Sequence, residues 1–360
     1  MTLVERRKII LRVEQSRCHT INVIKGVAVV FVIWGHCIQF FSGGIYDYFN
    51  DFAFKFIYSF HMPLFATISG YLFYDSLKKR SLLQIIKSKL SGLLWPIMFW
   101  CTVKYILNLI INELRGQFSI SLSAWMNEVT GMFLWFLWSI LAVSICIALV
   151  IKLLPKQFYW MGYILSFFAM YIFPNREMNL YLFPFFLFGY LARSTEKAWI
   201  RYWKQIVCVA IAVYVALIPF YRTSSYIYNS GVTIWTSNYR VLNQLLIDVY
   251  RYIIGAAGCI TIIGLIIFIS DKIKKAESVA LWGQESLQIY ILQSFALTWI
   301  WPMIWERIVE KLKYNPLIQN TIVYWGITAV LAIAILLVLS KIATAMKRIP
   351  KVNKFLFGGR

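Results

Sequence analysis

The chain has 360 residues, of which 60% are hydrophobic and only 14% are charged. A soluble protein of this length is nearer half apolar and a quarter charged, so this composition excludes an ordinary soluble enzyme. Runs such as "WGITAVLAIAILLVLS" approach the length of a bilayer span, and we predict an all-α, polytopic membrane protein.

Ten apolar segments are predicted to cross the membrane. They lie at about 20–41, 53–77, 91–111, 131–151, 157–173, 179–193, 204–221, 249–270, 283–304 and 320–341. The charged opening shows no cleavable signal pattern, so we expect the first span to remain as an anchor. We predict a basic lead (1–19), a transmembrane domain (20–345) and a basic tail (346–360).

The net charge of +21 is divided unevenly between the two sides of this topology. With the N-terminus inside, and with charges near span ends counted in the adjoining segments, the inner segments hold 25 Lys and Arg and the outer segments hold nine, while Lys25 and Lys104 lie deeper within spans. This asymmetry follows the positive-inside rule and predicts that both termini are cytoplasmic. The charge therefore does not indicate a nucleic-acid partner; attraction of an anionic cytosolic ligand is compatible but not required.

Cysteines and histidines show no metal-ligand pattern. The six cysteines lie mainly in or beside spans without C-x-x-C pairing, and the three histidines have no ligand spacing. We interpret the cysteines as small apolar packing residues and predict no metal site.

The first span, "NVIKGVAVVFVIWGHCIQ", carries a polar stripe. Lys25 and His36 share one helical face about 16 Å apart along the axis, and Asn22 and Gln39 lie within about 60° of it. Polar groups at this depth cost several kcal/mol unless they face a wet cavity or partners in the bundle. The alternative is a histidine satisfied by an inter-helix hydrogen bond and a lysine that snorkels to the surface.

The second span, "FIYSFHMPLFATISGYLF", places His61 at a depth comparable to that of His36. Pro63 bends the helix there, and Ser69 and Gly70 allow close approach of another backbone. His61 could be a packing residue. Two imidazoles at one depth on adjacent helices also allow one to accept a proton while the other orients a substrate group.

Three further groups are candidates for substrate contacts. Lys104 and Asn108 share a face of the third span. The outer connection 222–248 offers aromatic groups, Trp235 and Tyr239 among them, that suit sugar rings or an interfacial belt. The inner side carries cations that could bind phosphates or reflect topology alone, namely Lys78, Lys79, Arg80, Lys87 and Lys89.

The sequence resembles the bacterial acyltransferase-3 family of integral membrane acyltransferases, in the branch that O-acetylates sugars and polysaccharides. The resemblance rests on "NVIKGVAVVFVIWGH" followed by "FHMPLFATISGYLF", and then on "KLSGLLWPIMFW", "WFLWSILAV", "FPFFLFGYLAR" and "ESLQIYILQ", in the family's order over about residues 21–295. The first two together are specific. The family's opening pattern is a basic residue followed by ten residues and a histidine, and here it corresponds to Lys25 and His36.

The resemblance implies an inner-membrane enzyme that moves an acyl group, most often acetyl, from cytosolic acyl-CoA to a hydroxyl of a cell-surface or exported glycan. It implies that His36 is catalytic and that His61, Ser69 and Gly70 belong to the same site. The sequence departs from the family where many relatives have Arg-x-x-Arg before the third span, here Lys89 and Gly92. A second departure is Gln293, where relatives often end the motif with histidine.

The mechanism that this implies has His36 as general base, with His61 positioning the acceptor or donating to the oxyanion and Lys25 stabilising negative charge. A transient acyl-enzyme remains an alternative, although Cys37 points about 100° away from His36. A transporter or flippase for a glycan or small metabolite is the competing hypothesis, and a membrane sensor is a weaker one. The acyl group, the acceptor and the oligomeric state are not determined by the sequence.

Overall fold

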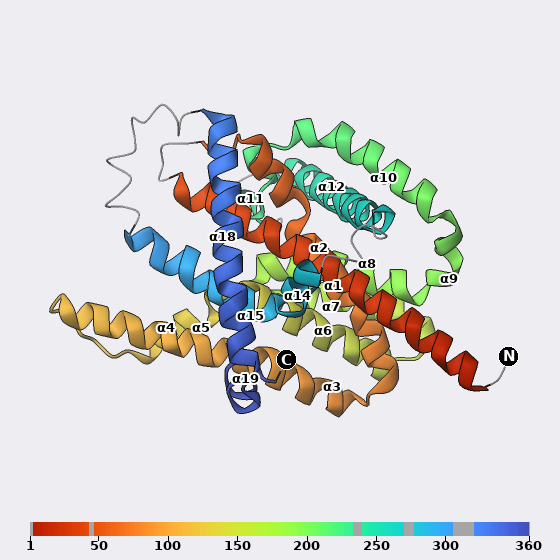
Figure 1. Cartoon of the computed structure of the whole chain (residues 1–360), viewed down its shortest axis with the longest axis horizontal. Helices are drawn as coiled ribbons and strands as arrows, with labels where there is room; N and C mark the ends of the chain where they lie inside the picture. The colour runs from red at the N-terminus through yellow and green to blue at the C-terminus, as the bar shows by residue number, and fades with distance from the viewer. Residues whose placement is uncertain (1–2, 43–46, 233–239, 270–276, 305–319, 360) are drawn as a thin grey trace. The chain divides into compact units, whose positions relative to one another are not determined.

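The computed structural model describes residues 3–42, 47–232, 240–269, 277–304 and 320–359, with side chains from residue 17 onward. Within these residues every regular element is a helix (Figure 1), which confirms the all-α prediction.

Seven helices among the described residues are long and apolar enough to cross a bilayer. The other three predicted spans are also helical, as α2 (Phe52–Lys79), α7 (Tyr159–Ala169) and α8 (Arg176–Ser194), but they do not belong to this set. The structure thus supports a multi-pass protein with seven candidate spans among the described residues, and the predicted count of ten is not confirmed. These spans are Arg17–Phe41, Leu82–Leu114, Leu122–Leu153, Glu196–Phe220, Val241–Phe268, Ser286–Ile304 and Thr321–Lys347.

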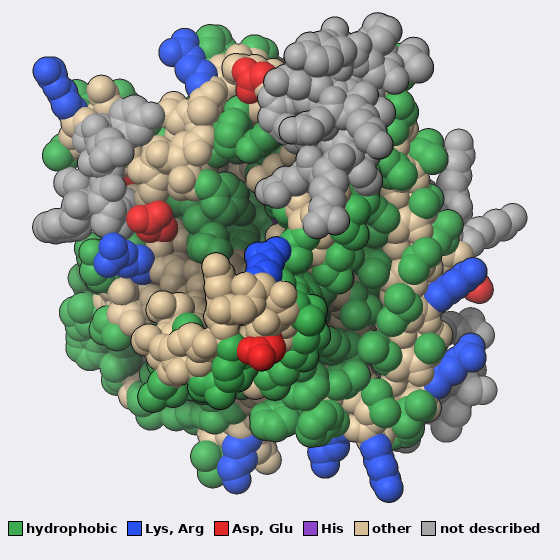
Figure 2. Space-filling model, turned by 90° about the vertical axis from the view of Figure 1, so that its left-hand side faces the viewer, with side chains coloured by type: hydrophobic (Ala, Val, Ile, Leu, Met, Phe, Trp, Pro, Cys, Tyr) green, Lys and Arg blue, Asp and Glu red, His purple; other side chains and the backbone are tan. Residues whose placement is uncertain are grey.

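Hydrophobic side chains remain exposed along several of these helices, as a lipid environment requires. Val209 and Val215 on α10 (Trp203–Leu217), and Val330 and Val338 on α18 (Thr321–Lys347), are each more than half exposed. Figure 2 shows one face of the molecule on which hydrophobic groups predominate and charged groups are scattered. Exposing an apolar surface of this extent to water is unfavourable, so it indicates that these helices contact lipid.

The chain divides into two compact units that interleave along the sequence. The first contains Met1–Phe65, Trp199–Tyr221 and Ile254–Thr344. Its helices are α1 (Leu3–Phe41), the first half of α2, α10, the second half of α12 (Val241–Phe268), α14 (Glu277–Gln284), α15 (Ser286–Gln293), the π-helical segment Ser294–Ile300 and most of α18.

The core of the first unit forms where α1, α15 and α18 pack together. One apolar stripe of α1 at a four-residue spacing contacts Ile289 of α15 and residues of α18 that are three or four positions apart. Cys37 belongs to this stripe and is fully buried, which confirms its interpretation as a packing residue. The α1 stripe consists of Val29, Ile33, Cys37 and Phe41.

The second unit contains Ala66–Ala198, Arg222–Ile253 and Ala345–Arg360. The segment that follows α2 forms α3 (Leu82–Lys89), which begins with a reciprocal capping box between Ser81 and Gln84. The unit's helices are the second half of α2, α3 (Leu82–Lys89), the π-helical segment Leu90–Leu94, α4 (Trp95–Leu114), α5 (Leu122–Thr130), α6 (Trp135–Leu153), α7, α8, α9 (Glu196–Trp199), α11 (Ile227–Ser230), the first half of α12 and α19 (Pro350–Phe357).

Two glycines bring α2 and α8 into backbone contact in the second unit. A Cβ at Gly70 would lie 1.9 Å from the Phe186 carbonyl oxygen, and one at Gly189 would lie 1.8 Å from the Thr67 carbonyl oxygen. Small residues at reciprocal positions allow helices in a membrane to approach this closely.

Substituting either glycine by alanine should destabilise the protein, because the added methyl group forces the two helices apart. We expect Gly70→Ala and Gly189→Ala each to cost about 1–3 kcal/mol, measured as a lower midpoint of thermal unfolding in detergent. The matched control is Gly326→Ala in α18, where a Cβ meets nothing within 4 Å. Unfolding midpoints for Gly70→Ala and Gly189→Ala equal to that of the control would contradict the packing argument.

Candidate functional site

The two membrane histidines lie in the first unit, at the contact between α1 and α2. A Cβ at Gly35 would lie 3.0 Å from the Tyr58 ring, so α1 passes close to α2 at this level. His36 is half-buried, whereas His61 is only 4% exposed. The two imidazoles are near enough to interact electrostatically. The structure therefore brings together the two histidines that the sequence singled out.

The His61 ring is oriented by the backbone of its own helix. Its Nδ1 lies 2.8 Å from the Ile57 carbonyl oxygen, which can only accept a hydrogen bond. A neutral His61 must therefore carry its proton on Nδ1, and its Nε2 then presents a lone pair. In this tautomer, His61 Nε2 can accept a hydrogen bond from a substrate hydroxyl but cannot donate one to an oxyanion.

Gln39 links the histidines through tyrosine. The Tyr58 hydroxyl donates to Gln39 Oε1 at 2.9 Å, and the Tyr58 ring meets His61 edge-on with centroids 4.7 Å apart. The Gln39 side chain also interacts with His36 and Tyr48. Burial raises the pKa of the Tyr48 phenol, which therefore stays protonated. Gln39, predicted as a substrate contact, is thus the centre of this network.

His36 keeps one ring nitrogen open. Its Nδ1 is buried and has no hydrogen-bond partner among the described residues, while its ring stacks on Phe40 at 5.6 Å. A buried polar atom without a partner at membrane depth is costly and is accounted for if substrate supplies the partner.

Lys25, the other predicted member of the stripe, lies in a different environment. It is half-buried and precedes Gly26, at which an added Cβ would lie 1.9 Å from the Val279 carbonyl oxygen of α14. The tight α1–α14 contact surrounds this level of α1, some 16 Å below His36. The histidine network does not include Lys25.

The remaining predicted substrate contacts that are described belong to the second unit. Ser69 is half-buried, and Gly70 is buried against α8, which fills the space that its missing side chain leaves. Gly70 thus acts in helix packing. Trp235 and Tyr239 lie outside the described residues.

Lys104 and Asn108 come together on α4, as their spacing predicts, but around a carboxylate. Lys104 Nζ forms an ion pair with Glu128 Oε2, and Asn108 Nδ2 donates to Glu128 Oε1 at 3.0 Å. Lys104 also lies over the Phe133 ring at 5.0 Å. Glu128 on α5 neutralises Lys104, so this group is an ion pair rather than an additional cation.

The predicted phosphate-binding cations lie at the end of α2 and on α3. Lys89 is half-buried over the Phe73 ring at 4.6 Å, Lys78 lies over the Tyr74 ring at 4.5 Å, and Arg80 donates to Ser88 Oγ at 3.1 Å. Four of the five are exposed, namely Lys78, Lys79, Arg80 and Lys87.

Arg251 and Glu285 are among the buried charged residues that were not predicted from the sequence. Arg251 on α12 is 1% exposed and donates to the carbonyl oxygens of Ser225 at 2.9 Å and Gly231 at 2.8 Å, with Asp248 as its carboxylate partner at 3.2 Å. It therefore fixes the described part of the outer connection. The second, Glu285, belongs to the motif "ESLQIYILQ".

Glu285 is 1% exposed and accepts hydrogen bonds from two hydroxyl groups of α18. Ser340 Oγ donates to its Oε2 at 2.7 Å, and Thr344 Oγ1 donates to its Oε1. No periodicity reveals such partners, because they lie 55 and 59 residues further along the chain.

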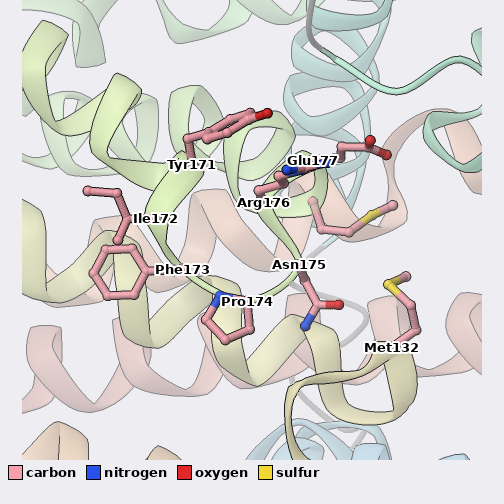
Figure 3. A pocket seen from close by; sticks show the side chains of 9 residues that line it. Met132, Tyr171, Ile172, Phe173, Pro174, Asn175, Arg176 and Glu177 are labelled. Atoms are coloured by element: carbon pink, nitrogen blue, oxygen red, sulfur yellow. The ribbon is translucent and has the colours of Figure 1, made fainter. Parts of the chain in front are cut away.

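A surface pocket of about 500 Å³ in the second unit is lined by Met132, by the segment 171–175 and by the first residues of α8. Figure 3 shows Tyr171 and Arg176 at its upper side and Asn175 directed toward Met132. The Arg176 guanidinium lies over the Tyr171 ring at 4.7 Å. Asn175, in left-handed conformation, donates to the carbonyl oxygens of Thr130 and Gly131, which shapes the floor.

In the described part of the chain no group of three or more His, Cys, Asp or Glu is placed to hold a metal ion.

Replacing Tyr58 by Phe should lower the catalytic rate without unfolding the protein. The ring against His61 is kept, but Gln39 loses a donor and His36 its fixed orientation, so we expect kcat to fall about tenfold. The matched control is Tyr159→Phe, which removes a hydroxyl donor to the Ile151 carbonyl in the second unit. Equal kcat in the two variants would contradict the network's role.

Comparison with known proteins adds independent information. A family model described as an acyltransferase domain matches residues 19–341. The chain is 24% identical over 352 residues to the nodulation protein NolL of Mesorhizobium japonicum, covering 93% of this chain and 88% of that protein. It is 27% identical over 301 residues to NolL of Sinorhizobium fredii, covering 79% of each. No solved structure matches.

Proposed function

Because the chain belongs to the acyltransferase-3 family and is a membrane acyltransferase of the non-aminoacyl type, we propose that it transfers an acetyl group from cytosolic acetyl-CoA to a hydroxyl of a cell-surface or exported glycan. The observation that carries this proposal is the His36–Gln39–Tyr58–His61 network. It provides two neutral imidazoles at membrane depth, one with an unoccupied ring nitrogen.

The network supports His36 as the general base. If Nε2–H donates to Gln39 Oε1, Nδ1 carries the lone pair that faces the substrate. The acceptor hydroxyl gives its proton to Nδ1 while its oxygen attacks the thioester carbonyl. The tetrahedral intermediate then expels the coenzyme A thiolate, which takes that proton back from the imidazolium, so the acyl group is transferred and His36 is regenerated.

His61 is assigned the positioning of the acceptor. Its Nε2 lone pair can accept a hydrogen bond from a hydroxyl, and the Nδ1 bond to Ile57 holds the ring in that orientation. The environment of Cys37 favours direct transfer of the acyl group over an acyl-enzyme formed on the Cys37 thiol, because Cys37 is fully buried in apolar packing. The inner lysines and Arg80 are proposed to hold the donor's phosphates as point charges.

Replacing His36 by Ala should remove the acyl groups from the glycan without reducing the amount of glycan exported. Mass spectrometry of envelope glycans would show loss of the mass of one acetyl group per modified residue, because no general base remains. The control is His19→Ala, which changes the same residue type on α1 outside the network. Loss of the glycan itself, with acylation of the remainder intact, would favour a transporter instead.

Replacing His61 by Asn should lower kcat with little change in KM for acetyl-CoA. The Asn amide can still donate to the Ile57 carbonyl, but the Nε2 acceptor is lost, and positioned acid–base groups contribute about 10²–10⁴-fold. Steady-state kinetics on the full chain in detergent would measure this. An increase confined to KM for acetyl-CoA would show that His61 contacts the donor rather than the acceptor.

A further inference from the structure

The C-terminal segment, predicted as a basic tail, is a helix that is bound to a specific place in the second unit. Figure 1 shows α19 and the C-terminus beside the junction of α3 and α4. The last carbonyls of a helix have no partner within it, and here two indoles supply the donors. Trp95 Nε1 donates to the Phe355 carbonyl at 2.6 Å, and Trp100 Nε1 donates to the Leu356 carbonyl at 2.9 Å.

Aromatic packing and a glycine turn complete this attachment. Phe357 is fully buried and stacks on Trp100 with centroids 5.8 Å apart. Gly358 has φ +67°, and a Cβ there would lie 1.9 Å from the Ser91 carbonyl oxygen and 2.9 Å from Gly92 Cα. The chain therefore ends against the π-helical segment Leu90–Leu94, one turn beyond the cations of α3.

The attachment of α19 brings together two basic segments, neither of which contains an acidic residue. Segment 76–94 contains five Lys and Arg, segment 345–360 contains five more, and neither contains Asp or Glu. On α19 the exposed Lys351 and Lys354 share one helical face, while its aromatic end packs on α4. Phe357 is buried, and Phe355, although 55% exposed, contacts Trp95 and Phe99, while the exposed Lys351 and Lys354 make the surface that α19 offers to a ligand cationic.

We propose that α19 and α3 together form the surface that binds the phosphates of the acyl donor, with Lys351 and Lys354 acting beside Lys87 and Lys89. The proposal rests on the proposed function, because it takes coenzyme A as the donor's carrier. Coenzyme A bears a diphosphate and a 3′-phosphate, so it needs several cations over an extended surface. One helix of eight residues would not provide this, whereas two segments joined by Trp95 and Trp100 do.

The test is equilibrium binding of coenzyme A and 3′-dephospho-coenzyme A to the full chain in detergent. We expect Lys351→Gln/Lys354→Gln to raise the Kd for coenzyme A about tenfold, equivalent to the loss of one or two charge-assisted hydrogen bonds. The Kd should also become less dependent on salt. The matched control is Lys152→Gln/Lys156→Gln, which removes the same charge from the segment predicted on the same side of the membrane.

A second variant tests the attachment without changing any charge. Gly358→Ala should displace α19 and raise the Kd to the same extent, because the methyl group meets the Ser91 carbonyl. Its control is Gly116→Ala, which has the same positive φ but nothing within 4 Å. A folded Gly358→Ala variant with the Kd of the Gly116→Ala control would overturn the proposal.

Other outcomes separate this proposal from the proposed function. Wild-type Kd in the double lysine variant, or an equal rise in its control, would overturn the role of α19 and leave the donor assignment intact. If the wild type fails to bind coenzyme A, the donor assignment itself fails. An effect that appears only in vesicles containing phosphatidylglycerol would show that the lysines contact lipid headgroups, and would also overturn the proposal.

Discussion

The constraint on which this protein depends is that a polar group within a membrane must find its partner inside the bundle. His61 meets it with the Ile57 carbonyl, and Gln39 meets it with the Tyr58 hydroxyl. The same constraint makes Nδ1 of His36 informative, because this buried atom has no hydrogen-bond partner among the described residues. A substrate hydroxyl that bonded to this nitrogen would meet the constraint.

This constraint also explains how the buried charges differ in role. Lys104, Arg251 and Glu285 are each held by groups 20 or more residues away in the chain, so they fix the fold of their unit. Their bonds are directional and desolvated, and breaking one partner would leave an uncompensated charge. The cations of α3 and α19 are different, because they gather at a surface without acidic partners in their own segments.

Much of the fold and part of the site could be predicted from the sequence. The helical class followed from apolar length, and the pairing of Lys104 with Asn108 on one face followed from helical periodicity. The count of ten spans is not confirmed: seven of the predicted segments have the length and hydropathy of a span in the described residues, and α2, α7 and α8 do not belong to that set. Glu128 was missed because its partners lie on another helix, and no local pattern records such a contact.

By itself, the sequence determined that the chain enters a membrane as helices and that His36 and Gln39 share one face of the first, because these depend on hydropathy and on 3.6 residues per turn. Only the tertiary structure decided which groups are the hydrogen-bond and ion-pair partners of the buried polar side chains. In the folded protein Gly70 packs against α8, Lys104 forms an ion pair with the Glu128 carboxylate, and Trp95 donates a hydrogen bond to the C-terminal helix. These outcomes depend on packing between segments far apart in the chain, which no local periodicity encodes.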